Sequence, residues 1–437
     1  MVAGGLVGLL GGGFRYLLGL ADHLRSALIV QAHVAPVYGV CATLLAVGTA
    51  AALARWMVVR FAPIAAGSGV QHVEAMMRGE VRPAGAAVIP VKFIGGLLAI
   101  GAGLALGREG PTVQMGSTIG TLLSRSVLPN APDRMVVDAA GAGAGLAVAF
   151  NAPIGGSIFV FEELTRSFTP RLVIATIGAA AVAVAVMRLM LGDHQEFSAG
   201  TPTYQPIGQL PLFLGLGALL GLAGAGYNAL TLGFLIVADR LSAIPSLVRA
   251  AAIGVVVGAA GWFAPALIGG GDVLAQGMLS DISAHLATTS LALIFVARLV
   301  LGPVCYAAGT PGGLFAPLLA VGATFGLLYV RVVDLWLPGV PLPPIAFAVV
   351  GMAALFTAVV RAPLTGMMLT IEMTGRADLA LAMLFACLSA AVVATAVGSE
   401  PIYDSLRCRM LAAMNGSSGP VEKPLSAVQA VGLATPG

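Results

Sequence analysis

The sequence predicts an all-α polytopic membrane protein made of two repeats of broken and tilted helices around an anion pathway. Three observations support this fold class: the hydropathy of the chain, an internal duplication, and glycine-rich turns between apolar runs. Of the 437 residues, 58% are hydrophobic and 9% are charged. Soluble globular domains carry about 25% charged residues. The composition therefore excludes a soluble globular protein.

Several apolar runs reach the roughly 20 residues that a helix needs to cross a hydrocarbon core. The 58 glycines and 26 prolines interrupt many of these runs. Inside a bilayer, interrupted backbone is tolerated only where it faces protein or a water-filled cavity, so the breaks indicate a transport pathway. The expected spans are Ala35–Val59, Gly85–Leu106, Leu210–Val237, Leu291–Ala308 and Leu379–Val397, after an N-terminal membrane helix over Met1–Leu20.

The charge and motif content of the chain excludes several functions. The net charge is +3 and no basic cluster occurs, so we expect no nucleic-acid partner. The four cysteines lack CxxC spacing and the five histidines lack metal-ligand spacing, so we expect no metal and no cofactor. HExxH and GxSxG motifs are absent, which argues against an intramembrane enzyme.

An internal duplication divides the chain. Three collinear blocks recur with slowly drifting offsets of 202 (263−61), 206 (313−107) and 210 (362−152). They begin at Phe61, Gly107 and Ala152 in the first half and at Phe263, Gly313 and Ala362 in the second. We expect one transmembrane domain over 1–411, with repeats over 1–193 and 205–409, and a flexible tail over 412–437.

The central motif is the glycine-rich turn over 107–116. Gly110 and Pro111 favour a helix start, because proline is tolerated in a first helical turn and glycine permits a sharp turn. The free N–H groups of that turn form an anion site. Glu109 lies at this site, so it is predicted to occupy it as a tethered anion and to leave it when protonated.

Two further turns offer anion ligands. The turn over 312–317 contains no charge, so only backbone N–H groups such as those of Leu314 and Phe315 can serve an anion there. A helix start contributes roughly half a positive charge, which favours passage of an anion over its trapping. Ser68, in Gly67-Ser68-Gly69, either caps the helix that follows it or binds an anion.

Together these motifs resemble the three signature motifs of the CLC family of chloride channels and chloride/proton antiporters, in the same order. The segments 145–163 and 361–374 are also similar to that family, and the likeness covers about 4–411. The resemblance implies two halves of inverted topology and a homodimer with one pore per subunit. It implies the prokaryotic type, because the tail over 412–437 is too short for paired cytoplasmic regulatory domains.

The resemblance also implies roles for single residues. Ser68 and the amides of Leu314 and Phe315 would bind the central anion, together with the hydroxyl of Tyr403. Glu109 would be the external gate and proton carrier. The internal proton-transfer residue would be Glu163. From the residues alone, Glu163 and Tyr403 each have an alternative interpretation. Glu163 would lie at a solvated helix end, and Tyr403 would be an interfacial aromatic residue.

Intramembrane cations form another group, because an ionisable residue in apolar surroundings is by default functional or paired. Arg108, Lys92 and Arg298 are assigned to the electrostatic field of the pathway rather than to direct ligation. The chain departs from the family at Val70-Gln71, where an apolar residue and a proline are common. Without that proline, the helix start after Ser68 is expected to be less rigid than in the family.

We therefore expect a multi-pass protein of the bacterial inner membrane that exchanges chloride for protons, gated by Glu109. A passive chloride channel of the same family is the alternative, since Glu163 alone favours exchange. An exchanger with another anion preference is a further alternative, although Ser68 argues against fluoride and nitrate. A purely structural membrane protein would leave the three glycine turns unexplained. The expected partners are chloride, protons, the lipid bilayer and a second copy of the chain.

Overall fold

A computed structural model describes residues 1–128, 131–201, 206–280 and 286–415. Over these residues the secondary structure is helical, with two isolated β-bridges. Of the tail expected over 412–437, residues 416–437 lie outside the described part, so the expectation of flexibility there stays a prediction.

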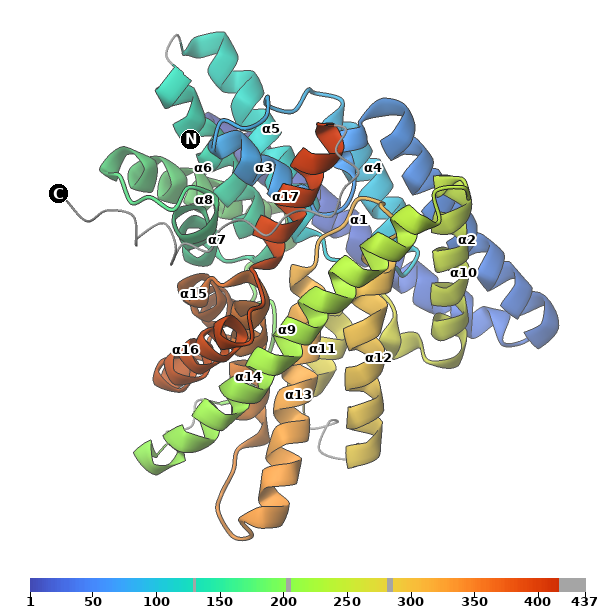
Figure 1. Cartoon of the computed structure of the whole chain (residues 1–437), viewed down its shortest axis with the longest axis vertical. Coiled ribbons are helices and arrows are strands. Elements are labelled where there is room, and N and C mark those ends of the chain that lie inside the picture. Colours follow the sequence, from blue (N-terminus) through green and yellow to red (C-terminus); the bar gives the residue numbers. More distant parts are fainter. Residues whose placement is uncertain (129–130, 202–205, 281–285, 416–437) are drawn as a thin grey trace, which may run out of the picture.

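The element order of the first half recurs in the second half, and one extra helix follows (Figure 1). The first half contains α1 (Val2–Ala32), α2 (Pro36–Phe61), η1 (Pro63–Ala65), α3 (Val70–Met77), α4 (Val88–Gly101), α5 (Glu109–Val127), α6 (Ala131–Phe150), α7 (Pro153–Phe159), η2 (Val160–Leu164) and α8 (Pro170–Leu191). The second half contains η3 (Ile207–Gln209), α9 (Leu210–Arg240), α10 (Ser246–Phe263), η4 (Pro265–Leu267), α11 (Asp272–Met278), α12 (Thr288–Tyr306), α13 (Phe315–Trp336), α14 (Pro344–Val360), α15 (Pro363–Thr374), η6 (Ala377–Leu379) and α16 (Ala380–Ala396). The extra helix is α17 (Ile402–Met414).

Eight helices of the described chain are long and apolar enough to cross a membrane. They confirm the expected N-terminal membrane helix and four of the five expected spans. The span expected over Gly85–Leu106 is wrong, because α4 is a helix of 14 residues that ends at Gly101. Gly103 then adopts φ +113, a left-handed conformation that ends helical geometry. The chain after it turns toward the motif at Gly107.

Both halves pack their central helix pair through glycines. A Cβ on Gly116 of α5 would clash with the carbonyl of Gly141 on α6. In the second half, a Cβ on Gly322 of α13 would clash with the carbonyl of Gly351 on α14 in the same way. Small residues let helix backbones approach closely inside a bilayer, where packing rather than the hydrophobic effect drives association. The duplicated glycines therefore give the two halves a common framework.

Helix α17 lies between the halves. Figure 1 shows it in red, beside the blue helix α3. It contacts α3 of the first half and α14 of the second half. A residue at its start is thus placed beside elements of both repeats.

Candidate anion site

The three glycine turns meet at one place inside the molecule. Gly107 and Gly313 exchange two backbone hydrogen bonds of 2.8 and 2.7 Å, which join the starts of α5 and α13. The amide of Gly67 donates to the carbonyl of Thr310 at 3.1 Å, and the amide of Gly312 donates to the carbonyl of Gly67 at 3.0 Å. The turn before α3 therefore joins the same assembly. Helix starts from both halves converge there, as a dipole-lined anion site requires.

The carboxylate of Glu109 lies at this meeting point. Glu109 is fully buried, and its Oε1 accepts hydrogen bonds from the amides of Phe315 at 2.5 Å and Ala316 at 3.3 Å. No donor among the described residues reaches Oε2. The first-half carboxylate thus occupies the amide site of the second half, as a tethered anion would.

The amides that bind this carboxylate overlap with, but are not identical to, the pair predicted to bind a diffusing anion. The sequence pointed to Leu314 and Phe315. The helix α13 begins at Phe315, with Leu314 as its N-cap residue, so the free amides of its first turn start at Phe315. A role for the Leu314 amide toward a diffusing anion stays a prediction.

Two buried hydroxyl groups face the same place. Ser68 and Tyr403 are both completely buried, and their side chains face each other. Neither hydroxyl oxygen has a hydrogen-bond partner of good geometry among the described residues. Ser68 Oγ also lies against Gly110, where a Cβ would clash with it. Leaving buried hydroxyls unpaired costs free energy, so such a pair beside helix starts fits an anion ligand.

The turn that carries Ser68 is held by Lys92. The ammonium group of Lys92 donates to the carbonyls of Gly67 at 2.7 Å and Ser68 at 2.9 Å. Gly67 and Gly69 adopt φ +64 and +85, a conformation that glycine reaches at little cost. The sequence assigned Lys92 to the field of the pathway. The structure adds that Lys92 binds the two peptide carbonyls that flank the Cα of Ser68, and so fixes the backbone there.

The family's proline after this turn is replaced by a polar contact. Gln71 accepts a hydrogen bond from the amide of Gly69 through Oε1 at 3.1 Å. The hydroxyl of Tyr306 accepts a further one from the amide of Ser68 at 3.3 Å. These side chains satisfy amides at the start of α3 that would otherwise lack partners. At Val70-Gln71, where the family commonly has an apolar residue and a proline, these two hydrogen bonds hold the start of α3 instead.

Arg298 performs in the second half what Lys92 does in the first. Its guanidinium donates through Nη1 to the carbonyls of Leu267 and Gly269, each at 2.9 Å. The turn over 269–271 has Gly270 where the first half has Ser68, at the block offset of 202 (270−68). Arg298 therefore holds a turn that carries no hydroxyl.

Arg108 is paired with a backbone carbonyl and two acidic side chains. It donates to the carbonyl of Ala149 at 2.8 Å, to Glu196 at 2.5 Å and to Asp272 at 3.2 Å. Burial opposes ionisation of Glu196, but the charges of Arg108 and Arg15 outweigh it and hold the pKa of Glu196 below its ordinary value. Sequence reasoning missed Glu196, because a single acid in a polar linker carries no signal of a partner 88 residues away.

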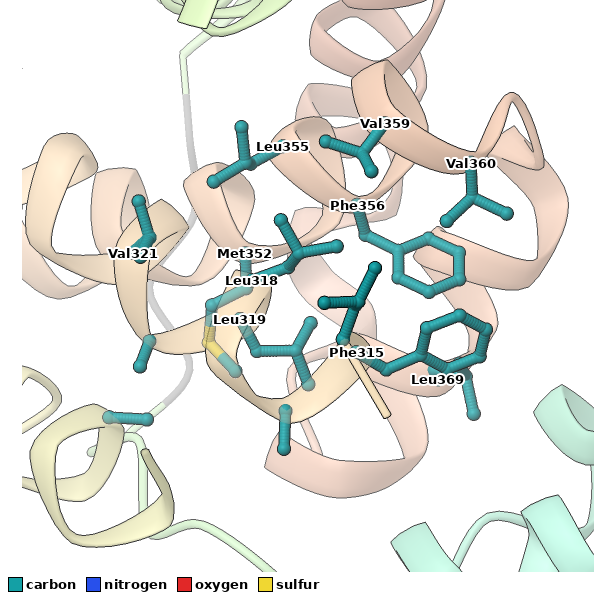
Figure 2. Close-up of a cluster of buried hydrophobic side chains, with 14 of the residues drawn as sticks. Phe315, Leu318, Leu319, Val321, Met352, Leu355, Phe356, Val359, Val360 and Leu369 are labelled. Atoms are coloured by element: carbon teal, nitrogen blue, oxygen red, sulfur yellow. The ribbon is translucent and has the colours of Figure 1, made fainter. Parts of the chain in front are cut away.

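Aromatic packing fixes the start of α13 and Tyr403 together. The ring of Phe315 packs edge to face against Phe356 with centroids 4.8 Å apart, and against Tyr403 at 5.5 Å. Figure 2 shows Phe315 and Phe356 side by side, with Leu369 of α15 next to them. The hydroxyl and the helix start are thus positioned by one apolar cluster.

Glu163 and its neighbour have different surroundings. Glu163 lies in the π-turn η2, is 2% exposed, and its Oε1 has no partner among the described residues. Glu162 accepts hydrogen bonds from the amides of Leu364 at 3.1 Å and Thr365 at 2.7 Å, and so caps α15. Burial argues against the alternative that Glu163 is a solvated helix end. π-turns inside helices occur often at functional sites.

A multi-span chain whose broken helices from two repeats bring amides, hydroxyls and a carboxylate to one buried point is a membrane transport protein for small anions. The chain belongs to the voltage gated chloride channel family. The family's model matches residues 50–395.

Known relatives extend this similarity over most of the chain. An H(+)/Cl(-) exchange transporter ClcA of Vibrio parahaemolyticus is 40% identical over 369 residues, 82% of this chain and 77% of the relative. ClcA of Vibrio campbellii is 37% identical over 424 residues, 94% and 88% of the two chains. A slow cyanobacterial Cl-/H+ antiporter of known structure has a TM-score of 0.89 at 34% identity, covering 95% of this chain and 97% of its own. A eukaryotic CLC transporter shares the fold, with a TM-score of 0.77 at 22% identity over 93% of this chain and 73% of its own.

Proposed function

We propose that this protein is a chloride/proton antiporter in which Glu109 gates the chloride path and carries the proton. One observation supports this most directly. The Glu109 carboxylate accepts hydrogen bonds from the amides of Phe315 and Ala316, beside the unpaired hydroxyls of Ser68 and Tyr403. Relatives 36% to 40% identical are named as H(+)/Cl(-) exchange transporters.

The mechanism follows from competition for one set of donors. An ionised Glu109 and a chloride ion are both monovalent anions that suit the amides at the start of α13. When Glu109 takes up a proton its charge is lost, so it leaves these donors and a chloride ion replaces it. The hydroxyls of Ser68 and Tyr403 then donate to that chloride. The same carboxyl group therefore moves a proton each time it yields to chloride.

Glu163 would pass protons between Glu109 and the opposite solution. Its burial keeps the carboxyl away from bulk water, and its unpaired oxygen is free to bind a water molecule or a proton. No backbone amide of the described residues donates to Glu163, unlike Glu162, so Glu163 can change its protonation state without releasing a helix cap.

The test is a simultaneous measurement of chloride and proton fluxes in liposomes that contain the purified protein. A chloride gradient is expected to drive protons against their own gradient, and the reversal potential is expected to shift when a pH gradient is imposed. A reversal potential that depends on chloride alone would show the passive channel instead. Replacing chloride with nitrate or fluoride in the same liposomes would reveal another anion preference.

We also propose a homodimer in the inner membrane of a bacterium, as the family implies. Ile154 and Leu364 occupy equivalent positions, 210 residues apart (364−154), at the starts of α7 and α15. Both are 48% exposed, so the two repeats present an apolar face together. The mass of the detergent-solubilised protein measured by light scattering should equal two chains. A mass of one chain would contradict the dimer.

A further inference from the structure

A cluster of charged side chains lies where α3 meets α17. It consists of four carboxyl groups and three guanidinium groups, and we call it the α3–α17 cluster: Glu74, Arg78, Glu80, Glu163, Arg166, Asp404 and Arg407. The mechanism above uses only Glu163. With all groups ionised the cluster carries a net charge of −1 (3−4), and one bound proton makes it neutral. The surroundings therefore favour one proton shared among the carboxyl groups.

Glu74 is the buried centre of this cluster. It is 0% exposed, and its Oε1 lies 2.5 Å from Arg78, 3.5 Å from Arg407 and 3.9 Å from Arg166. No N–H or O–H group among the described residues reaches its Oε2. Glu74 and Asp404 share the same three guanidinium partners, Arg78, Arg166 and Arg407. Neighbouring carboxyl groups favour a proton on one of them, because a second negative charge nearby is unfavourable.

The cluster connects the bulk solution to Glu163. Asp404 is 21% exposed at its side chain and pairs with Arg166 at 2.8 Å. Arg166 follows the π-turn that holds Glu163, and α3 contacts that turn directly. The charged groups that act on Glu163 are Glu74, Arg166, Asp404 and Glu162. Glu74 thus shares cations with a water-accessible carboxyl group and lies on the helix that contacts the turn of Glu163.

The other carboxyl groups nearby are committed to partners. Both oxygens of Glu162 accept backbone amides of α15. Both oxygens of Glu80 accept Nη1 of Arg407, at 2.6 and 2.8 Å. Both oxygens of Asp404 also accept guanidinium groups, but Asp404 is partly exposed and can therefore exchange protons with water. Among the described residues of the cluster, Glu74 combines full burial, an oxygen free of donors and a place on the helix that contacts the turn of Glu163.

We propose that Glu74 relays protons between Asp404 and Glu163. In one direction a proton taken up by Asp404 from water moves to Glu74, directly or through one water. Glu74 then gives it to the ionised Glu163, directly or through one water, and returns to the carboxylate. The three guanidinium groups hold the cluster together while the proton moves, and they stabilise whichever carboxylate is ionised. This inference rests on the proposed exchange of chloride for protons.

The test compares Glu74→Gln with the wild type in liposomes, recording proton and chloride fluxes together. Loss of a positioned acid–base group typically costs about 100-fold or more in rate. We therefore expect the proton flux of Glu74→Gln to fall about 100-fold, while chloride flux falls less than about twofold. Glu74→Asp keeps a carboxyl group and should restore part of the proton flux. A fall of both fluxes at the wild-type ratio, or no change, would overturn the relay.

Three further measurements keep the result interpretable. Glu80→Gln removes a carboxylate of the same cluster that lies outside the relay, and it should keep the wild-type flux ratio; an equal loss would assign the effect to cluster charge and overturn the proposal. Chloride binding measured by calorimetry checks that each variant is folded. If Glu74→Gln does not fold, Asp404→Asn replaces it with the same expected outcome. An uncoupled wild type would instead contradict the proposed function itself.

Discussion

The two halves of this molecule share a backbone and differ in the side chains that the backbone presents. Glu109 begins α5 and Phe315 begins α13, and the two positions are equivalent at the offset of 206 (315−109). Ser68 likewise corresponds to Gly270. The first half supplies a carboxylate and a hydroxyl, and the second half supplies the amides that donate to the carboxylate.

The cations behave in the opposite way, because they are retained in both halves. Lys92 and Arg298 are equivalent at the same offset of 206 (298−92). Lys92 donates to two carbonyls of the turn over 67–69, and Arg298 donates to the carbonyl of Gly269 in the other turn and to that of Leu267 just before it. Since the turn with Ser68 and the turn without it are held alike, these cations serve the backbone in both places. The comparison teaches that duplication supplied the geometry of the site, whereas asymmetric side chains supplied its chemistry.

The strongest way to break the comparison is to remove the carboxylate that only the first half carries. In Glu109→Gln the side chain keeps its size but binds no proton that can be transported. We expect chloride flux to persist and chloride-driven proton movement to disappear in the liposome assay. Retained proton pumping would contradict the assignment of Glu109.

The next largest effect is expected at Glu163, whose equivalent in the second half is Met373, 210 residues on (373−163). Glu163→Gln should lower proton flux by about 100-fold, the cost of losing an acid–base group, and chloride flux much less. Equal loss of both fluxes would make Glu163 structural. Glu372→Gln is the matched control, because Glu372 caps α7 through the amides of Ile154 and Gly155 and should change stability without changing the flux ratio.

A smaller effect is expected from the hydroxyl that distinguishes the two turns. Ser68→Ala removes one donor to the anion, and a hydrogen bond to a charged group contributes about 1.5 to 3 kcal/mol. Chloride affinity measured by calorimetry should therefore fall roughly tenfold or more. Gly270→Ser adds the hydroxyl to the other turn, where a Cβ meets no atom closer than 3.4 Å, and chloride affinity should stay unchanged. A gain of chloride binding in Gly270→Ser would show that both turns can act as sites.

The smallest effect is expected at the cap that replaces the family's proline. Gln71→Ala removes the acceptor of the Gly69 amide, which should destabilise the start of α3 by about 1 kcal/mol. The melting temperature should fall slightly, and chloride affinity should weaken less than in Ser68→Ala. An affinity loss as large as that of Ser68→Ala would mean that Gln71 contributes directly to the site.

Much of the fold and part of the candidate site could be predicted from the sequence. Glycine turns, prolines in first helical turns and apolar runs are local features that can be recognised in the sequence. The meeting of the helix starts of α3, α5 and α13 could therefore be predicted, and the structure has it. The contact of the Ala316 amide with Glu109 was not predicted, because the amides that the first turn of α13 presents depend on backbone conformation at Leu314. The contacts of Glu196 and of Glu74 could not be predicted, since their partners lie on distant segments.

The reciprocal caps at α7 and α15 have a consequence for how the protein is made. Glu162 of the first repeat completes a helix of the second, and Glu372 of the second completes a helix of the first. Neither repeat can satisfy all of its helix ends alone. During synthesis the amides at the start of α7 therefore lack their Glu372 cap until the later repeat has been made.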